Sequence, residues 1–169
     1  MGIFNVIIDT SESMNEFGKI GIINSLISYF ENYKKNNETE FIYSLWNSSI
    51  SPLDIDKYEG IIDFSDNCDF GKLYNDMLLQ KKMSNIDYFI IISDANFYSD
   101  NLEYFLKTFK DSIIPILIGC DSFPNIMKNF NSSKIEYEPK DIYLLFDKLK
   151  CKKIMSKELF KQIEQRELN

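Results

Sequence analysis

Two short segments of the sequence contain the side chains that could do chemistry. Asp9, Ser11 and Ser13 occupy alternate positions of the run DTSESM, and Asp94 comes soon after the apolar run 88–92. Carboxylate and hydroxyl oxygens are ligands for hard cations such as Mg²⁺, Mn²⁺ or Ca²⁺. A tight loop can turn alternate side chains towards one ion, and two nearby carboxylates repel each other without a positive charge between them. The spacing therefore predicts a divalent-cation site built by these four side chains.

A purely structural interpretation of the same residues is the alternative. Asp and Ser often form a turn and cap the next helix, and Asp94 alone could cap a helix after a strand. A motif in its expected structural context is a stronger signal than a bare pattern. We therefore interpret the set as metal ligands, with Asp94 acting through a water molecule.

The elements that must position these residues alternate between strand and helix. Short apolar runs that end in polar turn residues predict strands at 3–8, 40–46, 60–64, 88–92, 113–118 and 134–137. Apolar residues at helical spacing predict helices at about 18–33, 70–78, 102–109 and 125–130, and a last helix that starts at Pro139. This order indicates an α/β fold, in which a doubly wound and mostly parallel sheet is covered by helices on both faces.

The expected sheet brings the two segments to one place. In an open parallel sheet, ligands bind beyond the carboxyl ends of the strands, where successive connections leave in opposite directions. The strands 3–8 and 88–92 each lead to one of the two aspartates. If these strands are neighbours, Asp9 and Asp94 converge and the two serine hydroxyls surround the same point.

Length, charge and histidine content exclude several classes of function. The chain has 169 residues, a net charge of −7 and no histidine. The length suits one domain, which we place at 1–150. The segment 151–169 is predicted to be a charged terminal helix or tail that packs on this domain, with a helix that docks a partner as the less common alternative. A nucleic-acid partner would need a basic stripe, which is missing. The lack of histidine removes Ser-His-Asp and Cys-His catalysis and most zinc chemistry.

The cysteines and the first residues bear on the compartment. Cys68, Cys120 and Cys151 are odd in number and widely separated, which favours structural thiols in a reducing cytoplasm. The apolar run 1–8 is too short for a signal peptide or a membrane span. We therefore expect a cytoplasmic protein without membrane contact.

Three segments resemble the von Willebrand factor A (vWA) domain family. DTSESM at 9–14 resembles the DxSxS signature of its metal-ion-dependent adhesion site, or MIDAS. IIISDA at 90–95 is similar to the family's strand ending in Thr-Asp-Gly, and IIPILIG at 113–119 to a later strand ending in glycine. The resemblance covers roughly 1–149. It implies a six-stranded sheet in the order 3-2-1-4-5-6 with strand three antiparallel, and a Mg²⁺ or Mn²⁺ ion whose coordination is completed by an acidic residue of a protein partner.

The sequence departs from this family at the position of a threonine ligand. Counting back from Gly71 places Cys68 there, and a thiol is a poor ligand for magnesium. Asp66, Asn67, Asp69 or a water molecule could take over the contact. The structural interpretation of Cys68 is that a small residue fills the space of the threonine.

Smaller departures and neighbouring residues are interpreted as structural. Glu12 and Ala95 replace two glycines of the family pattern, and neither change removes an oxygen ligand. Trp46 is predicted to be a packed aromatic side chain at the edge of the sheet. The serines of the segment 48–51 are predicted to form a solvated loop.

These observations lead to three hypotheses about function. The first is a non-catalytic, metal-ion-dependent module that binds a protein. The alternative is a scaffold subunit of a multiprotein complex, of the stress-response or ATPase-linked kind in which intracellular bacterial relatives occur, with a degenerate metal site. A metal-dependent hydrolase is the least favoured, because no histidine, activated nucleophile pair or Gly-rich phosphate loop accompanies the aspartates.

Overall fold

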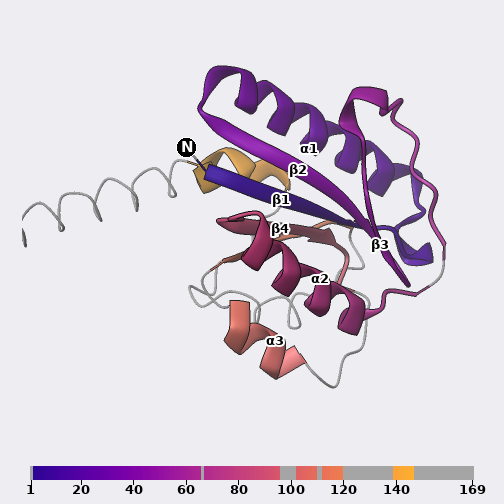
Figure 1. Ribbon diagram of the computed structural model, residues 1–169. Helices are drawn as coiled ribbons and strands as arrows, with labels where there is room; N and C mark the ends of the chain where they lie inside the picture. Colours follow the sequence, from indigo (N-terminus) through magenta and orange to yellow (C-terminus); the bar gives the residue numbers. More distant parts are fainter. Residues whose placement is uncertain (1, 66, 96–101, 110–111, 120–138, 147–169) are drawn as a thin grey trace, which may run out of the picture. The chain divides into compact units, whose positions relative to one another are not determined.

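The computed structural model describes residues 2–65, 67–95, 102–109, 112–119 and 139–146 (Figure 1). The chain divides into two compact units, Met1–Pro139 and Lys140–Asn169, which are considered separately. The boundary predicted at 150/151 lies outside the described residues.

The first unit is built on a five-stranded sheet. Its strands, in chain order, are β1 (Gly2–Asp9), β2 (Thr39–Trp46), β3 (Ile50–Pro52), β4 (Tyr88–Ser93) and β5 (Ile113–Leu117), and they lie in the order β3-β2-β1-β4-β5. β1 pairs in parallel with β2 and β4, β4 pairs in parallel with β5, and β3 runs antiparallel to β2. The predicted α/β fold, its strand order and its antiparallel third strand are confirmed for these five strands. The expected sixth strand, 134–137, lies outside the described residues.

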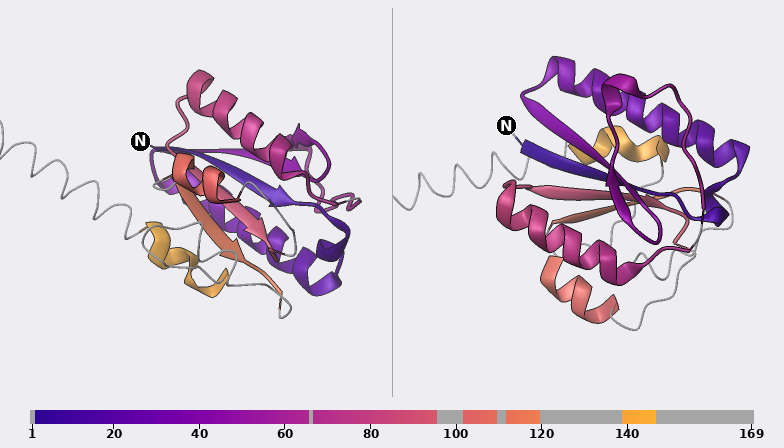
Figure 2. Two further views of the ribbon diagram at one scale, coloured as in Figure 1. Left: turned by 90° about the horizontal axis from the view of Figure 1, so that it is seen from below. Right: turned by 45° about the vertical axis from the view of Figure 1, so that its right-hand side comes forward.

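Helices cover both faces of this sheet. They are α1 (Phe17–Asn36), α2 (Phe70–Met83) and α3 (Leu102–Phe109), and the left view of Figure 2 shows α1 on one face and α2 and α3 on the other. Two short 3₁₀ turns, Glu12–Met14 and Ile55–Lys57, lie in the loops. The predicted helices at 18–33, 70–78 and 102–109 are confirmed, whereas 125–130 lies outside the described residues.

Alternate residues of the strands serve the two faces. Ile7 and Ile91 belong to the buried cluster that includes Leu73 of α2. On the opposite face, the ring of Phe41 lies 5.1 Å from that of Phe30 in α1 and 5.4 Å from that of Phe4. Both faces are therefore apolar, which explains why the parallel strands are continuous apolar runs in the sequence.

The third strand is not where the sequence predicted it. No strand forms at 60–64; the structure places β3 at Ile50–Pro52, so Ser51 belongs to a strand and not to a solvated loop. Asn47 explains the difference, because its side-chain oxygen accepts a hydrogen bond from the Ser49 backbone N–H (3.0 Å) and its own N–H donates to the Ser49 carbonyl (3.0 Å). This tight turn folds the chain back onto β2 and occupies the free edge there.

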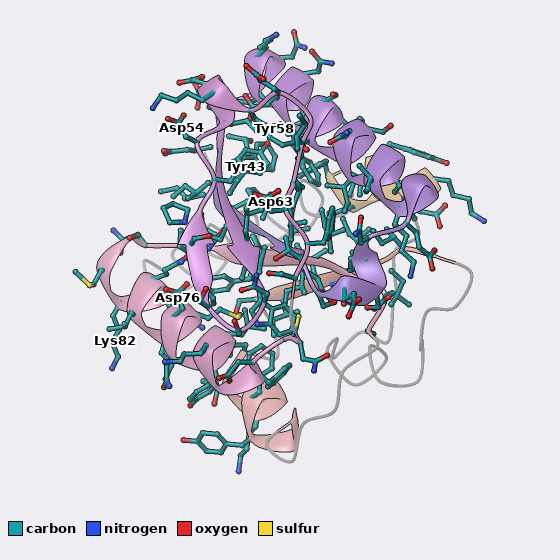
Figure 3. All side chains as sticks on the ribbon, turned by 90° about the vertical axis from the view of Figure 1, so that its right-hand side faces the viewer. Tyr43, Asp54, Tyr58, Asp63, Asp76 and Lys82 are labelled. Carbon is teal, nitrogen blue, oxygen red and sulfur yellow. The ribbon has the colours of Figure 1, made fainter. Side chains whose placement is uncertain are left out.

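A chain of hydrogen-bonded polar side chains leads from the buried face of the sheet to the half-buried side of α2. Ser44 donates to Asn5 (3.1 Å), Asn5 donates to Gln80, and Gln80 donates to Asp76 (2.5 Å). Burial raises the pKa of Asp76 above its usual range. Figure 3 labels Asp76 on α2 and Tyr43 on β2. The fully buried Asn5 is thus satisfied by hydrogen bonds, as a buried amide must be.

A 3₁₀ turn, Pro139–Asp141, begins at the last residue of the first unit and leads into helical residues 142–146 of the second unit. Ile142, Leu145 and Phe146 are buried, which confirms the predicted apolar face of this helix. The charged tail, 151–169, lies outside the described residues.

Candidate functional site

The carboxyl ends of β1 and β4 meet at the point where the sheet changes direction. β1 continues through α1 to β2 on one side, whereas β4 is followed by β5 on the other. Ile8 pairs with Ile92, so that Asp9 and Asp94 both lie just beyond the paired ends of these strands. This is the position at which parallel α/β sheets bind ligands.

Asp9 is a buried carboxylate surrounded by neutral hydrogen-bond donors. Its side chain belongs to a residue that is 1% exposed. Oδ1 accepts hydrogen bonds from the Ser11 backbone N–H (2.9 Å) and the Cys68 thiol (3.0 Å), and Oδ2 accepts one from the Ser93 hydroxyl (2.5 Å). Three segments of the chain therefore donate hydrogen bonds to one aspartate.

The two serines of the DxSxS pattern lie side by side. The Oγ atoms of Ser11 and Ser13 are 3.2 Å apart. Ligands at right angles around Mg²⁺ lie about 3 Å apart when each is ~2.1 Å from the ion. The Ser11 carbonyl accepts the Met14 N–H (3.0 Å), and the fully buried Met14 side chain anchors the loop. The loop therefore presents two hydroxyl oxygens at a spacing that suits a small cation.

Asp94 has a different kind of partner. The Lys19 ammonium lies 2.9 Å from Asp94 Oδ2 and 2.9 Å from the Ser13 carbonyl oxygen, to which it donates hydrogen bonds. Lys19 and Asp94 are 2% and 0% exposed. A buried ion pair therefore joins the end of β4 to the loop that follows β1.

Sequence reasoning missed Lys19, although the sequence contains a signal. Lys19 stands four residues before Ile23 and thus on the same side of α1 as the buried Ile23, Ile27 and Phe30. Lysine is almost never fully buried unless it is paired. A lysine on the apolar stripe of a helix therefore indicates a buried counter-charge, although the sequence does not say which one.

Cys68 lies at the predicted threonine corner, beside Asp9. Its Sγ donates to Asp9 Oδ1 and lies 3.7 Å from the Trp46 carbonyl oxygen. Burial, and next the charge of Asp9, raise the pKa of the Cys68 thiol well above its usual range. The thiol therefore stays protonated and acts as a hydrogen-bond donor, a more specific role than filling space.

Two described residues proposed to replace the threonine, Asp69 and Asn67, do not contact Asp9 through any observed hydrogen bond. Asp69 caps α2, with its Oδ1 accepting the Lys72 N–H (3.0 Å), and Asn67 is exposed. Asp66 lies outside the described residues. Trp46 is fully buried and its indole N–H donates to the Asp69 carbonyl (3.0 Å), which confirms that it is a packed aromatic.

The two residues that replace glycines of the family pattern, Ala95 and Glu12, both fit the backbone of their loops. Ala95 is buried and has a φ of 59°, the left-handed conformation that glycine adopts most easily, and its N–H donates to the Ser93 hydroxyl (2.8 Å). The alanine therefore keeps the backbone path that a glycine would take. Glu12 lies in a 3₁₀ turn, which any L-residue can form.

The divalent cation implied by the vWA resemblance fits only half of this site. Ser11, Ser13 and Asp9 supply oxygen atoms on one side. On the other side Asp94 is paired with Lys19, and a protonated thiol stands where a hydroxyl ligand is expected. No group of three or more His, Cys, Asp or Glu side chains within the described residues is placed to hold a metal. The full ligand set of an adhesion site is therefore not reproduced.

No protein-family model matches the sequence, and no curated protein matches it. Solved structures do share its architecture. The conserved hypothetical protein BatB from Bacteroides thetaiotaomicron matches with a TM-score of 0.52 and 11% identity, over 70% of this chain and 66% of its own. Proximal thread matrix protein 1 from the mussel byssus matches with a TM-score of 0.53 and 9% identity, over 87% of this chain and 44% of its own.

This chain has a vWA-like fold. At such low identities the similarity establishes the fold alone, and the chain spans two thirds or less of the length of these two structures. No helix within the described ranges is both long enough and apolar enough to cross a membrane.

Proposed function

We propose that this vWA-like chain is a non-catalytic module that binds a protein through the carboxyl edge of its sheet. The supporting observation is the convergence of Asp9, Ser11 and Ser13 at the switch point between β1 and β4. Ser13 is partly exposed and Glu12 is exposed, so that a partner can reach the loop. Without histidine, the serine hydroxyls lack the base that nucleophilic catalysis most often uses.

The first form of this proposal depends on a divalent cation. Mg²⁺ or Mn²⁺ would be held by the two serine hydroxyls and Asp9, and an acidic residue of the partner would complete the coordination. The spacing of the two hydroxyl oxygens supports this form. Ca²⁺ suits the same kind of ligand but tolerates a larger coordination shell.

The second form is a scaffold module that binds its partner without a divalent cation. The buried Lys19–Asp94 pair favours this form, because it supplies a positive charge to the site from the chain itself. A subunit of a multiprotein complex would then use the same edge through hydrogen bonds and shape.

Partner capture tests the proposal. Immobilised wild-type protein and the variant S11A/S13A are exposed to lysate of the organism that encodes the chain, in Mg²⁺ or in chelator. S25A is the matched control, because Ser25 is an exposed serine of α1 that bonds to the Gly21 carbonyl. We expect the wild type and S25A to retain a partner that S11A/S13A loses.

Comparison of capture in Mg²⁺ with capture in chelator distinguishes the cation-dependent module from the scaffold. Capture that is lost in chelator supports the cation-dependent module, and capture that survives in chelator supports the scaffold. If S11A/S13A folds, as judged by circular dichroism, and still retains every protein that the wild type retains, the edge is not the binding surface.

A further inference from the structure

The position of Lys19 has no counterpart in the metal-site pattern. Lys19 lies in the first turn of α1 and is 2% exposed. Burial of an ammonium is costly unless a counter-charge and hydrogen bonds replace its water, and a positive charge in the first turn is also opposed by the helix dipole. Both the burial and the helix dipole oppose a lysine at this position. We therefore expect its ammonium to have a specific role there.

The ammonium lies between the two halves of the site. It contacts Asp94 beyond β4 and the Ser13 carbonyl in the loop after β1, both at 2.9 Å. The carboxylate of Glu16, which is 61% exposed, lies 3.7 Å from it. These are the two segments that a bound divalent cation would have to join, and a single side chain joins them here.

We propose that the Lys19 ammonium is a built-in cation of this site, and that a divalent cation reaches Asp94 only by displacing it. The charges explain why the two compete. With the ammonium in place, a divalent ion bound to Asp94 would lie beside a second cation at a buried carboxylate. Two positive charges so close together repel each other strongly where water is excluded.

The hydrogen bonds to Asp9 also indicate that the chain satisfies this site without a divalent cation. Its two oxygens already accept hydrogen bonds from a backbone N–H, a thiol and a hydroxyl. Both aspartates are thus satisfied by groups of the chain, so that the fold does not need a metal to hold them together. The inference concerns the edge used by the proposed function, but it does not require a protein partner and can fail separately from it.

Cation titrations test the inference directly. Mn²⁺ binding is measured by electron paramagnetic resonance of the free ion for wild type, K19M and K19R. Methionine is an unbranched side chain one atom shorter than lysine and without its charge, and arginine retains the charge as the matched control. We expect K19M to bind Mn²⁺ at least about tenfold more tightly than the wild type, which is 1.4 kcal/mol, and K19R to bind no more tightly than the wild type.

A second variant tests whether Asp94 is the group that binds Mn²⁺ more tightly in K19M. K19M/D94N removes both members of the pair, and we expect it to lose the tighter binding of K19M, because the released carboxylate is what recruits the ion. Equal affinity of wild type and K19M would overturn the inference. An equal gain in K19R would overturn it as well, because the charge would then not be the cause.

The wild type alone provides a test if K19M does not fold. We expect its thermal unfolding temperature to be nearly the same in millimolar Mg²⁺ and in chelator, because an ion that must displace Lys19 binds the native state too weakly to stabilise it. Stabilisation by Mg²⁺ that the variant D9N abolishes would show that the ion binds beside Lys19 without displacing it. A loss of partner capture, by contrast, would bear on the proposed function and leave these titrations unchanged.

Discussion

Asp9 and Asp94 follow neighbouring parallel strands and are both buried, yet the chain stabilises them in different ways. Asp9 accepts hydrogen bonds from three neutral donors, whereas Asp94 is paired with the Lys19 ammonium. Neutral donors leave the negative charge of Asp9 in place, so it can still attract a cation. An ion pair cancels the charge of Asp94. The site therefore has an acidic half at the DTSESM loop and a neutralised half beyond β4.

The alternation of side chains along β4 produces this difference. Ser93 follows Ile91 by two residues, so it shares the face of the sheet that packs on α2, and there it donates to Asp9. Asp94 is the next residue, and its carboxylate meets Lys19 of α1, the helix on the opposite face. Adjacent residues of one strand end thus contribute to the two halves.

The largest expected effect comes from breaking the neutralised half. D94A leaves the Lys19 ammonium buried without its counter-ion, and removal of one partner of a buried pair typically costs ~3–5 kcal/mol. We expect a loss of this size in the free energy of unfolding, measured by urea denaturation. The double variant K19M/D94A should be more stable than D94A, because it no longer buries a lone charge. If D94A costs less than ~1 kcal/mol, the pair is not a buried ion pair in solution.

A smaller loss is expected in the acidic half. S93A removes the hydroxyl that donates to Asp9 Oδ2 and accepts from the Ala95 N–H, and it leaves both buried groups without that partner, at a cost of ~1–3 kcal/mol. Urea denaturation beside the exposed-serine control S25A measures it, since surface substitutions typically stay within ~0.5 kcal/mol. Equal stability of S93A and S25A would mean that Asp9 does not depend on this bond.

Cys68 provides a graded test of the same half. C68V keeps the approximate size of the side chain but removes the donor to Asp9, and we expect it to lose ~1 kcal/mol of unfolding free energy. C68T keeps a donor in the same place and should lose less than C68V. A parallel urea series on both variants decides the point. If C68V and C68T have the same free energy of unfolding, the hydrogen bond to Asp9 does not contribute and Cys68 only fills space.

The smallest effect is expected for an ion pair outside the site. Lys57 Nζ lies 2.6 Å from Asp54 Oδ2, a shorter distance than in the Lys19–Asp94 pair, but both side chains are exposed. Water and salt screen such pairs, so K57A should leave the unfolding transition unchanged within error. A loss comparable to that of D94A would mean that burial does not distinguish the two pairs.

Much of the fold was predictable because its signals are local. Apolar runs and helical spacing identified four of the five described strands and the three helices around them, and turn residues marked where the strands end. The wrongly placed third strand shows the limit of such signals. The strand forms where the turn at Asn47 and Ser49 returns the chain to the free edge of β2, and a three-residue strand has too few residues to show a periodic pattern.

The class of fold and the positions of Asp9, Ser11, Ser13 and Asp94 near strand ends follow from local signals in the sequence, because periodicity and turn chemistry act between near neighbours. Which charges and hydrogen-bond donors meet depends on the folded chain. Lys19 is 75 residues from Asp94 in the chain, Cys68 is 59 from Asp9, and Ser93 is 84 from Asp9. Coulomb attraction and hydrogen bonding depend on distance in space, so the same DxSxS pattern is compatible with a metal or with a lysine until the fold brings α1 against the end of β4.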